Sequence, residues 1–185
     1  MTLLDLVVIT LAHLRTGLSH DALAVAFGVD RSTVTRAVGQ VRPLLAGRGC
    51  ATATGVRLRT LADVFAYAAA EGVTLRMDAT EIRVRRPRAG RGGRKAFVSG
   101  KARQNTIKST VISDGNGATL WCGTHRPGRV HDHTAVRLEG IDALLDAYPQ
   151  VRILVDSGCQ GLAKNHPGQV EAPPLKLRPG PGSRT

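Results

Sequence analysis

Residues 152–156 read Arg-Ile-Leu-Val-Asp, an aliphatic run that ends at an acid. An uninterrupted run of this kind is typical of a central strand buried on both faces of a parallel sheet. Helical spacing of apolar residues over 131–148 predicts a crossover helix directly before it. The run therefore predicts an α/β fold in the C-terminal part of the chain.

Three antiparallel strands are expected upstream of that crossover. Residues 73–84 alternate between apolar and polar side chains, the pattern of a half-buried strand. Residues 95–113 and 118–123 read as two further strands, joined by the turn Asp114-Gly115-Asn116-Gly117. With a helix over 58–70 in front of them, these segments predict a mixed sheet of three antiparallel strands and one parallel strand.

The first 50 residues have helical periodicity throughout. Apolar residues recur at helical spacing over 3–14, and a short second helix, capped by Ser19 or His20, ends at the turn Gly28-Val29. Asp30 is expected to cap a third helix, because aspartate is a favoured residue at the start of a helix. Three short helices with a tight turn between the second and third predict a helix-turn-helix unit.

The third helix of this unit has one apolar and one polar side. The apolar positions, which are expected to be buried, are Val34, Ala37, Val38 and Val41. A helix in the major groove reads base edges with Arg and Gln and contacts phosphates through Ser, Thr and Arg. The predicted DNA-binding residues are Arg31, Ser32, Thr33, Thr35, Arg36 and Gln40. The alternative is a plain helical bundle with a polar surface.

Charge and composition favour double-stranded DNA as the partner. The 185 residues carry a net charge of +12, and residues 81–108 alone contain ten cations and one acid. The ten cations are Arg83, Arg85, Arg86, Arg88, Arg91, Arg94, Lys95, Lys101, Arg103 and Lys108. Phosphates would neutralise such a cluster, although a solvated basic loop is the alternative. An aromatic content of 3% disfavours base-stacking and RNA-binding modules.

Cysteine usage and hydropathy place the chain in the cytoplasm. Three widely spaced cysteines without a Cys/His cluster suggest neither a disulfide framework nor a zinc site. The apolar run over 3–14 is interrupted by polar residues and is shorter than the roughly 20 residues of a membrane span. We therefore interpret it as a core helix.

Asp78 and Asp156 are the candidate metal ligands. Each directly follows an apolar strand residue, so the two acids converge if their strands are neighbours. Two carboxylates held close together call for a cation, and hard oxygen ligands favour Mg²⁺ or Mn²⁺. The alternative is that Asp156 caps the next turn and Asp78 is an exposed strand residue. Glu81 is expected on the opposite face of the strand, and Asp132 is interpreted as a helix cap.

The order of motifs resembles that of bacterial insertion-sequence transposases of the DDE class. After the helix-turn-helix come Met77-Asp78-Ala79-Thr80-Glu81, Phe97-Val98-Ser99-Gly100-Lys101, Pro127-Gly128-Arg129-Val130-His131-Asp132 and Val155-Asp156-Ser157-Gly158-Cys159-Gln160-Gly161. The resemblance implies a ribonuclease-H-like core in which Asp78 and Asp156 are the first two acids of a metal-binding catalytic triad. It also implies metal-dependent cleavage of element ends and transfer of their strands to target DNA. Lys101 and Lys108 are predicted to contact the DNA backbone, with ordinary exposed strand positions as the alternative.

The third acid of the triad has no good candidate in this sequence. Relatives place it on a helix well downstream of the second aspartate, whereas here Glu171 is followed by Pro173-Pro174. Proline disfavours a continuing helix, so we expect the ribonuclease-H-like sheet to lack its last strand and its Glu-bearing helix. Two functions remain open: an enzyme that cleaves and joins DNA, or a truncated binding protein that occupies element ends. Assembly into a homo-oligomer on DNA is also left open.

The expected division of the chain follows these motifs. Residues 1–50 form the DNA-binding domain and 51–72 a connecting helix. Residues 73–172 form the incomplete catalytic domain, and 173–185 form a Pro/Gly-rich tail.

Overall fold

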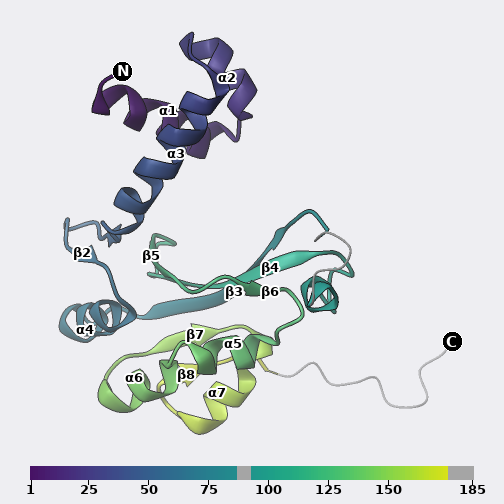
Figure 1. Ribbon diagram of the computed structural model, residues 1–185. Coiled ribbons are helices and arrows are strands. Elements are labelled where there is room, and N and C mark those ends of the chain that lie inside the picture. Colours follow the sequence, from purple (N-terminus) through teal and green to yellow (C-terminus); the bar gives the residue numbers. More distant parts are fainter. Residues whose placement is uncertain (87–92, 175–185) are drawn as a thin grey trace, which may run out of the picture. The chain divides into compact units, whose positions relative to one another are not determined.

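A computed structural model describes residues 1–86 and 93–174 of the chain (Figure 1). The chain divides into two compact units, Met1–Gly49 and Cys50–Thr185. The interior basic positions Arg88 and Arg91 and most of the predicted tail lie outside the described residues.

The N-terminal unit is helical. It contains α1 (Leu3–Thr16), α2 (His20–Phe27) and α3 (Arg31–Ala46). Thr2 and Asp5 form a capping box at the start of α1, and Ser19 caps α2 by accepting a hydrogen bond from the Ala22 amide. Gly28 ends α2 with a φ of 63°, a left-handed conformation that favours glycine. The predicted helix-turn-helix is confirmed.

A small core holds these three helices together. Its buried members are Ile9 of α1, Leu23 of α2, and Val34, Ala37 and Val38 of α3. Val41, one turn further along α3, is also buried. All four predicted apolar positions of α3 are therefore buried. Asp30 stands at the N-cap of α3 as expected, but its side chain makes no capping hydrogen bond.

The second unit is a mixed sheet with helices against it (Figure 1). A hairpin of β1 (Cys50–Ala51) and β2 (Arg57–Leu58) leads into α4 (Leu61–Glu71), and β3 (Leu75–Arg83) follows. The remaining strands are β4 (Thr106–Ser113), β5 (Thr119–Cys122), β6 (Arg126–Pro127), β7 (Ile153–Val155) and β8 (Val170–Glu171). Short helices η1 (Arg94–Phe97), α5 (Asp132–Leu138), α6 (Ile141–Ala147), η2 (Ser157–Cys159) and α7 (Gln160–Asn165) connect them.

The strand order is β5-β4-β3-β7-β8, with β6 paired to β4. β3, β4 and β5 are antiparallel, whereas β7 and β8 run parallel to β3. The α/β class and the ribonuclease-H-like arrangement are confirmed. The expected loss of the last strand is wrong, because β8 covers the outer edge of β7.

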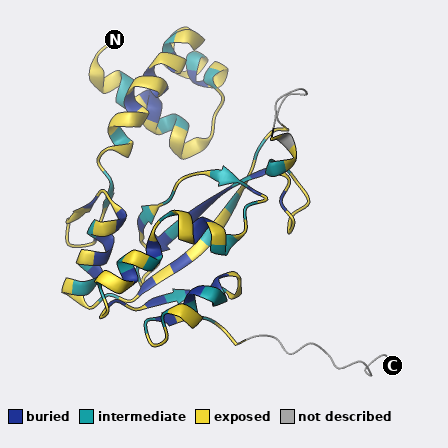
Figure 2. Cartoon of the chain, turned by 60° about the horizontal axis from the view of Figure 1, so that its bottom comes forward, coloured by how far each residue is buried: buried dark blue, intermediate teal, exposed yellow. Residues whose placement is uncertain are grey.

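One face of the sheet is buried under helices. Its core includes Met77 of β3 and Ile112 of β4, and helices α5 and α6 contribute Val136, Ile141 and Leu145. Along β3 the burial alternates, with Leu75 and Met77 buried and the residue after each exposed (Figure 2). This alternation leaves Asp78 on the face opposite to the helices.

Three boundaries differ from the sequence-based expectation. The expected helix over 131–148 is split into α5 and α6 at Gly140, whose φ is 76°. The expected strand over 95–113 begins only at Thr106, after η1 and a turn. The hairpin of β1 and β2 was not expected, so the connecting helix starts at Leu61 rather than Leu58.

Candidate metal centre and nucleic-acid interface

Asp78 and Asp156 occupy neighbouring positions of the sheet. The parallel pairing of β3 with β7 ends at Met77 opposite Val155; Asp78 is the next residue of β3, and Asp156 is the first residue after β7. Because side chains alternate along a strand, the Asp78 carboxylate is placed on the face opposite to Met77. Asp78 is exposed and Asp156 is half-buried. The register places Asp78 and Asp156 at the same end of neighbouring strands, and their joint binding of a metal ion stays a prediction.

The backbone orients both carboxylates locally. The Ala79 amide donates to Asp78 Oδ1 at 2.7 Å, and the Gly158 amide donates to Asp156 Oδ1 at 3.0 Å. Asp156 is also the N-cap of η2. Asp156 can therefore cap the turn with one carboxylate oxygen, Oδ1, and still bind a metal ion with the other.

A third carboxylate, that of Asp132, lies beside the turn that follows β7. A Cβ atom added to Gly158 would lie 2.8 Å from Asp132 Oδ2 and 3.2 Å from Asp156 Oδ1. Both acids therefore lie against the Gly158 Cα, and a larger side chain there would require them to shift. Burial raises the pKa of the Cys159 thiol to about 12, with added effects from Asp156, Asp132 and Asp78.

Asp132 is held by a buried ion-pair cluster rather than serving as the helix cap. The N-cap of α5 is His131, and Asp132 is its first helical residue. Lys108 Nζ lies 2.7 Å from Asp132 Oδ1 and 3.4 Å from Glu81 Oε1, and it donates to the Val130 carbonyl oxygen at 2.9 Å. The Lys108 side chain is only 8% exposed. We call Glu81, Lys108 and Asp132 the buried ion triad.

The triad shifts the titration of its members. Burial alone would lower the pKa of Lys108, but Asp132 and Glu81 outweigh it and raise that pKa above its usual range. Burial likewise opposes ionisation of Glu81, yet hydrogen bonds from Ser99, Lys108 and Thr106 leave its pKa lowered. Both groups are therefore stabilised in their charged forms.

The position of Lys108 requires a correction. Its ammonium group is buried and has three partners within the protein, so it is not placed to contact the DNA backbone. Lys108 shares the buried side of β4 with Thr106, Thr110 and Ile112, which explains its burial. Glu81 lies on the face opposite to Asp78, as expected, and pairs with Lys108 across the strands.

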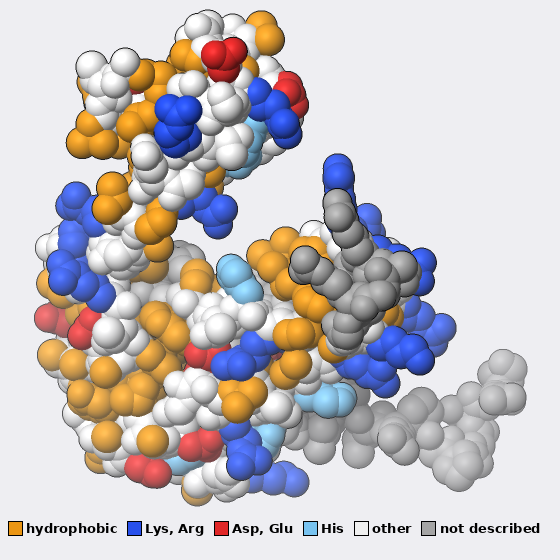
Figure 3. Space-filling view, viewed as in Figure 1, with side chains coloured by type: hydrophobic (Ala, Val, Ile, Leu, Met, Phe, Trp, Pro, Cys, Tyr) orange, Lys and Arg blue, Asp and Glu red, His pale blue; other side chains and the backbone are white. Residues whose placement is uncertain are grey.

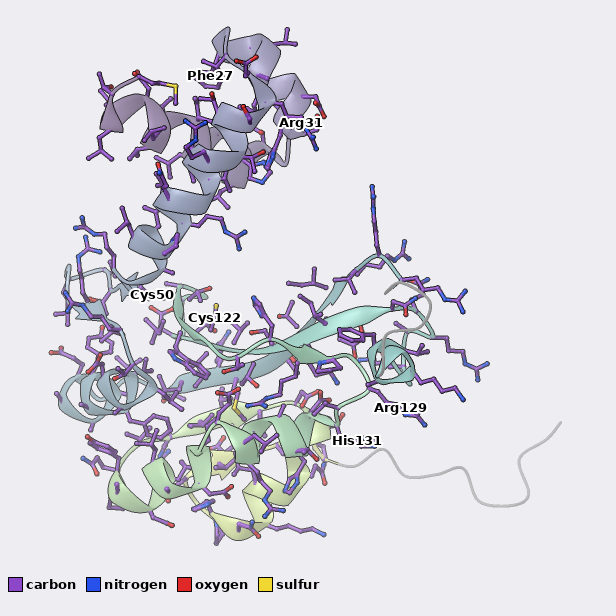
Figure 4. All side chains as sticks on the ribbon, viewed as in Figure 1. Phe27, Arg31, Cys50, Cys122, Arg129 and His131 are labelled. Atoms are coloured by element: carbon purple, nitrogen blue, oxygen red, sulfur yellow. The ribbon has the colours of Figure 1, made fainter. Side chains whose placement is uncertain are left out.

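A hollow of about 400 Å³ opens above this triad. Its lining comes from β3 and β4 and from the two loops that carry the Ser-Gly-Lys and Pro-Gly-Arg motifs; the residues are Glu81, Ser99, Gly100, Lys101, Lys108, Gly128, Arg129, Val130, His131 and Asp132. Lys101, Arg129 and His131 are exposed at its edge, and Figure 4 shows the latter two on the segment that leads from β6 into α5. Gly128 allows the close approach of this segment, because a Cβ there would meet the Thr106 side chain.

Cations gather around the same end of the sheet. Figure 3 shows Lys and Arg side chains clustered near η1. The exposed cations of this region are Arg83, Arg85, Arg86, Lys95, Lys101, Arg103 and Arg129. The described part of the basic segment is therefore a solvent-facing surface, with Lys108 as its buried exception.

Asp78 and Asp156 can supply two oxygen ligands to a divalent ion, which is fewer than the three carboxylates of a complete catalytic triad. Within residues 1–86 and 93–174, no three His, Cys, Asp or Glu side chains lie close enough together to hold a metal ion. Glu171 is exposed on β8, opposite Leu154 of β7. It lies on a strand and not on a helix, so it does not complete the pair of aspartates.

The polar side of α3 presents the predicted DNA-binding residues to solvent. Arg31, Ser32, Thr35, Arg36 and Gln40 are exposed and Thr33 is half-buried. Arg31 Nε lies 3.1 Å from Asp21 Oδ1 in an exposed ion pair. The Thr35 hydroxyl donates to the Arg31 carbonyl oxygen at 3.0 Å and lies 3.0 Å from His20 Nδ1. Solvent-exposed pairs of this kind contribute little to stability, so both residues can exchange these partners for DNA.

Comparison with known proteins identifies the class. Residues 77–171, more than half of the chain, match the family described as DDE superfamily endonuclease. Residues 1–51 match the helix-turn-helix of the DDE superfamily endonuclease. The chain therefore belongs to the DDE superfamily endonucleases, whose members depend on a divalent metal.

A curated relative narrows the likeness to insertion-sequence transposases. The chain is 23% identical, over 172 residues, to the probable transposase for insertion sequence element IS702 of Microchaete diplosiphon. The alignment covers 93% of this chain and 57% of that relative, so the chain spans a little over half of the relative's length. No solved structure matches the chain.

Hydropathy adds one observation on the described segments. None of their helices combines the length and the apolar character that a membrane crossing requires.

Proposed function

We propose that this chain binds the double-stranded ends of an insertion element through α3 and holds Mg²⁺ or Mn²⁺ between Asp78 and Asp156 for strand cleavage and transfer. The observation that supports the proposal is the parallel register of β3 and β7, in which the pairing of Met77 with Val155 leads directly into Asp78 and Asp156. The likeness to the probable transposase supports the same reading.

Different residues of the chain would bind the metal ion and the DNA backbone. Asp78 and Asp156 would hold the divalent ion, which when bound would supply activation of an attacking oxygen and stabilisation of the leaving oxygen of a phosphodiester. Asp78 and Asp156 supply two carboxylate ligands, which their backbone amides hold in position. We expect Lys101 and Arg129, exposed at the edge of the hollow, to bind the phosphate backbone. Because Lys108 offsets one of the two negative charges of Glu81 and Asp132, it weakens their repulsion of the DNA.

Metal binding is testable without DNA. We expect the full chain to bind Mn²⁺ saturably, because two adjacent carboxylates repel each other less when they share a cation. Titration followed by electron paramagnetic resonance of free Mn²⁺ measures this. Absence of saturable binding contradicts the metal centre and leaves the DNA-binding proposal standing as the function of a binding protein.

DNA recognition by α3 is testable with a double variant. We expect Arg31→Ala with Arg36→Ala to lose the preference for element ends over random duplex, since a bidentate Arg contact to a base contributes about 1–3 kcal/mol of discrimination. Nonspecific, salt-sensitive affinity should remain, because the other cations still attract phosphate. Fluorescence anisotropy at several salt concentrations measures both quantities.

The matched control removes the same charge elsewhere. Arg57 and Arg59 are exposed and lie outside α3. Arg57→Ala with Arg59→Ala should weaken binding to all duplexes alike and preserve the preference. If both double variants change the preference equally, α3 is not the reading helix.

A further inference from the structure

Two cysteines of the second unit lie on segments that pack against each other. Cys50 is the first residue of β1, and Cys122 is the last residue of β5. The two strands are in contact, and Figure 4 labels both residues. Both are free thiols, as is Cys159, which is buried in the core of the same unit. Cys50 and Cys122 are far apart in the sequence, so only the fold brings them together.

The two thiols are close enough to influence each other. Burial raises the pKa of the Cys122 thiol, and the neighbouring Cys50 thiol raises it further. A group of like charge disfavours ionisation in this way only when it is nearby. A disulfide joins residues whose Cα atoms are about 4.4–6.8 Å apart, which is the range of residues on segments in direct contact. The packing of β1 against β5 therefore suits a bond between these sulfur atoms.

Small molecules can reach this pair of thiols from solvent. Cys50 is half-buried and Cys122 is exposed. Cys122 pairs with Val111 of β4, and Val111 pairs with Asp78, so Cys122 belongs to the face of the sheet that the helices leave open. β5 is also the outermost strand at one end of the strand order. The pair differs in this respect from Cys159, which is buried.

We propose that Cys50 and Cys122 form a reversible oxidation site, at which exchange with a low-molecular-weight disulfide such as oxidised glutathione joins the two sulfur atoms. The more exposed Cys122 reacts first: its thiolate attacks the small disulfide, forms a mixed disulfide and releases one glutathione thiolate. The Cys50 thiolate then attacks the Cys122 sulfur and releases the second glutathione. The two protein thiols are oxidised to one disulfide, and the two glutathione thiolates take up their protons.

The disulfide would fasten the start of the second unit to its sheet. β1 begins directly after Gly49, the last residue of the N-terminal unit. Linking Cys50 to Cys122 therefore ties the point at which the helical unit joins the chain to the edge strand β5. Reduced glutathione reverses the reaction, so the link responds to the ratio of the two forms. This proposal does not depend on the metal centre or on DNA binding.

Peptide mapping of the full chain after treatment with oxidised glutathione tests the bond. The wild type should yield a disulfide-linked peptide pair that contains Cys50 and Cys122, and dithiothreitol should remove it. Cys159→Ala is the matched control, because it removes the third thiol and should form the same link. Cys50→Ser should lose the link and accumulate glutathione on Cys122, since no second thiol resolves the mixed disulfide. Circular dichroism spectra of the reduced proteins check that the variants fold.

The rate and the melting temperature give two further readouts. Because the pKa of Cys122 is raised, its reactive thiolate is scarce at neutral pH, so the rate of linking should rise about tenfold per pH unit there. Oxidation should raise the melting temperature of the wild type by several degrees and leave that of Cys122→Ser unchanged, because the link constrains the unfolded chain. A wild type that keeps three free thiols, a link that involves Cys159, or a link between two chains overturns the proposal.

Discussion

Asp78→Asn and Asp156→Asn are each expected to abolish metal-dependent nicking by this chain, with a loss of more than about a hundredfold. Even residues that only support metal ligands cost about 10–100-fold when they are replaced, so loss of a direct ligand costs more. Asparagine keeps the shape of the side chain but removes the negative charge that the ion requires. Relaxation of a supercoiled plasmid that carries element ends, with Mg²⁺ or Mn²⁺ and with a chelator, measures the activity.

The control for these variants is a nearby acid on the same sheet. Glu171 is exposed on β8 and stands opposite Leu154, two residues before Asp156. Glu171→Gln should nick like the wild type. Equal activity of the wild type and both aspartate variants refutes the catalytic assignment. A preparation in which Glu171→Gln alone is inactive shows instead that the site was assigned to the wrong acid.

The N-terminal unit could be predicted well because its helices and turns are encoded by residues close together in the sequence. The four apolar positions of α3 stand at helical spacing, and all four are buried. The turn before α3 needs a left-handed residue, and Gly28 supplies it with a φ of 63°. The capping of α3 was predicted only in part, because Asp30 occupies the N-cap position but its side chain makes no capping hydrogen bond.

The sequence predicted the long strands of the sheet and missed the short ones. β3, with nine residues, has a clear alternation of burial. β8 and the hairpin of β1 and β2 consist of two-residue strands, which are too short to show any period. Their pairing is decided by tertiary contacts, such as the parallel bridge between Ile153 and Val170. This is why a strand was wrongly expected to be missing.

The candidate site divides in the same way. Asp78 and Asp156 could be predicted because each follows an apolar strand residue, which is a local feature of the sequence. The partnership of Lys108 with Asp132 joins residues far apart in the chain and depends on how α5 packs against the sheet, so spacing did not indicate it. One signal was present in the sequence. Lys108 is separated from Thr106, Thr110 and Ile112 by even numbers of residues, so it shares their side of β4, and an apolar residue such as Ile112 on that side indicates that the side is buried.

Lys108→Met is expected to lower the free energy of unfolding, by less than the about 3–5 kcal/mol of a fully buried pair, because water partly solvates the two carboxylates that lose their partner. Here the uncompensated groups are Glu81 and Asp132, whose side chains are 19% and 28% exposed. Urea unfolding followed by circular dichroism measures the loss. Lys101→Met is the control, because Lys101 lines the same hollow but is exposed and should change stability little.

The pH dependence distinguishes loss of charge from loss of packing. The folded-state pKa of Glu81 is lowered, so its stabilising contribution is present above its unfolded pKa and is lost as the pH falls through the folded value. Lys108 has a raised pKa, so its contribution is present below its unfolded pKa and is lost as the pH rises through the folded value. The difference between wild type and Lys108→Met should therefore be largest near neutral pH and shrink as Glu81 is protonated. A difference that stays constant down to acid pH would mean that the Lys108 side chain stabilises the fold by packing alone.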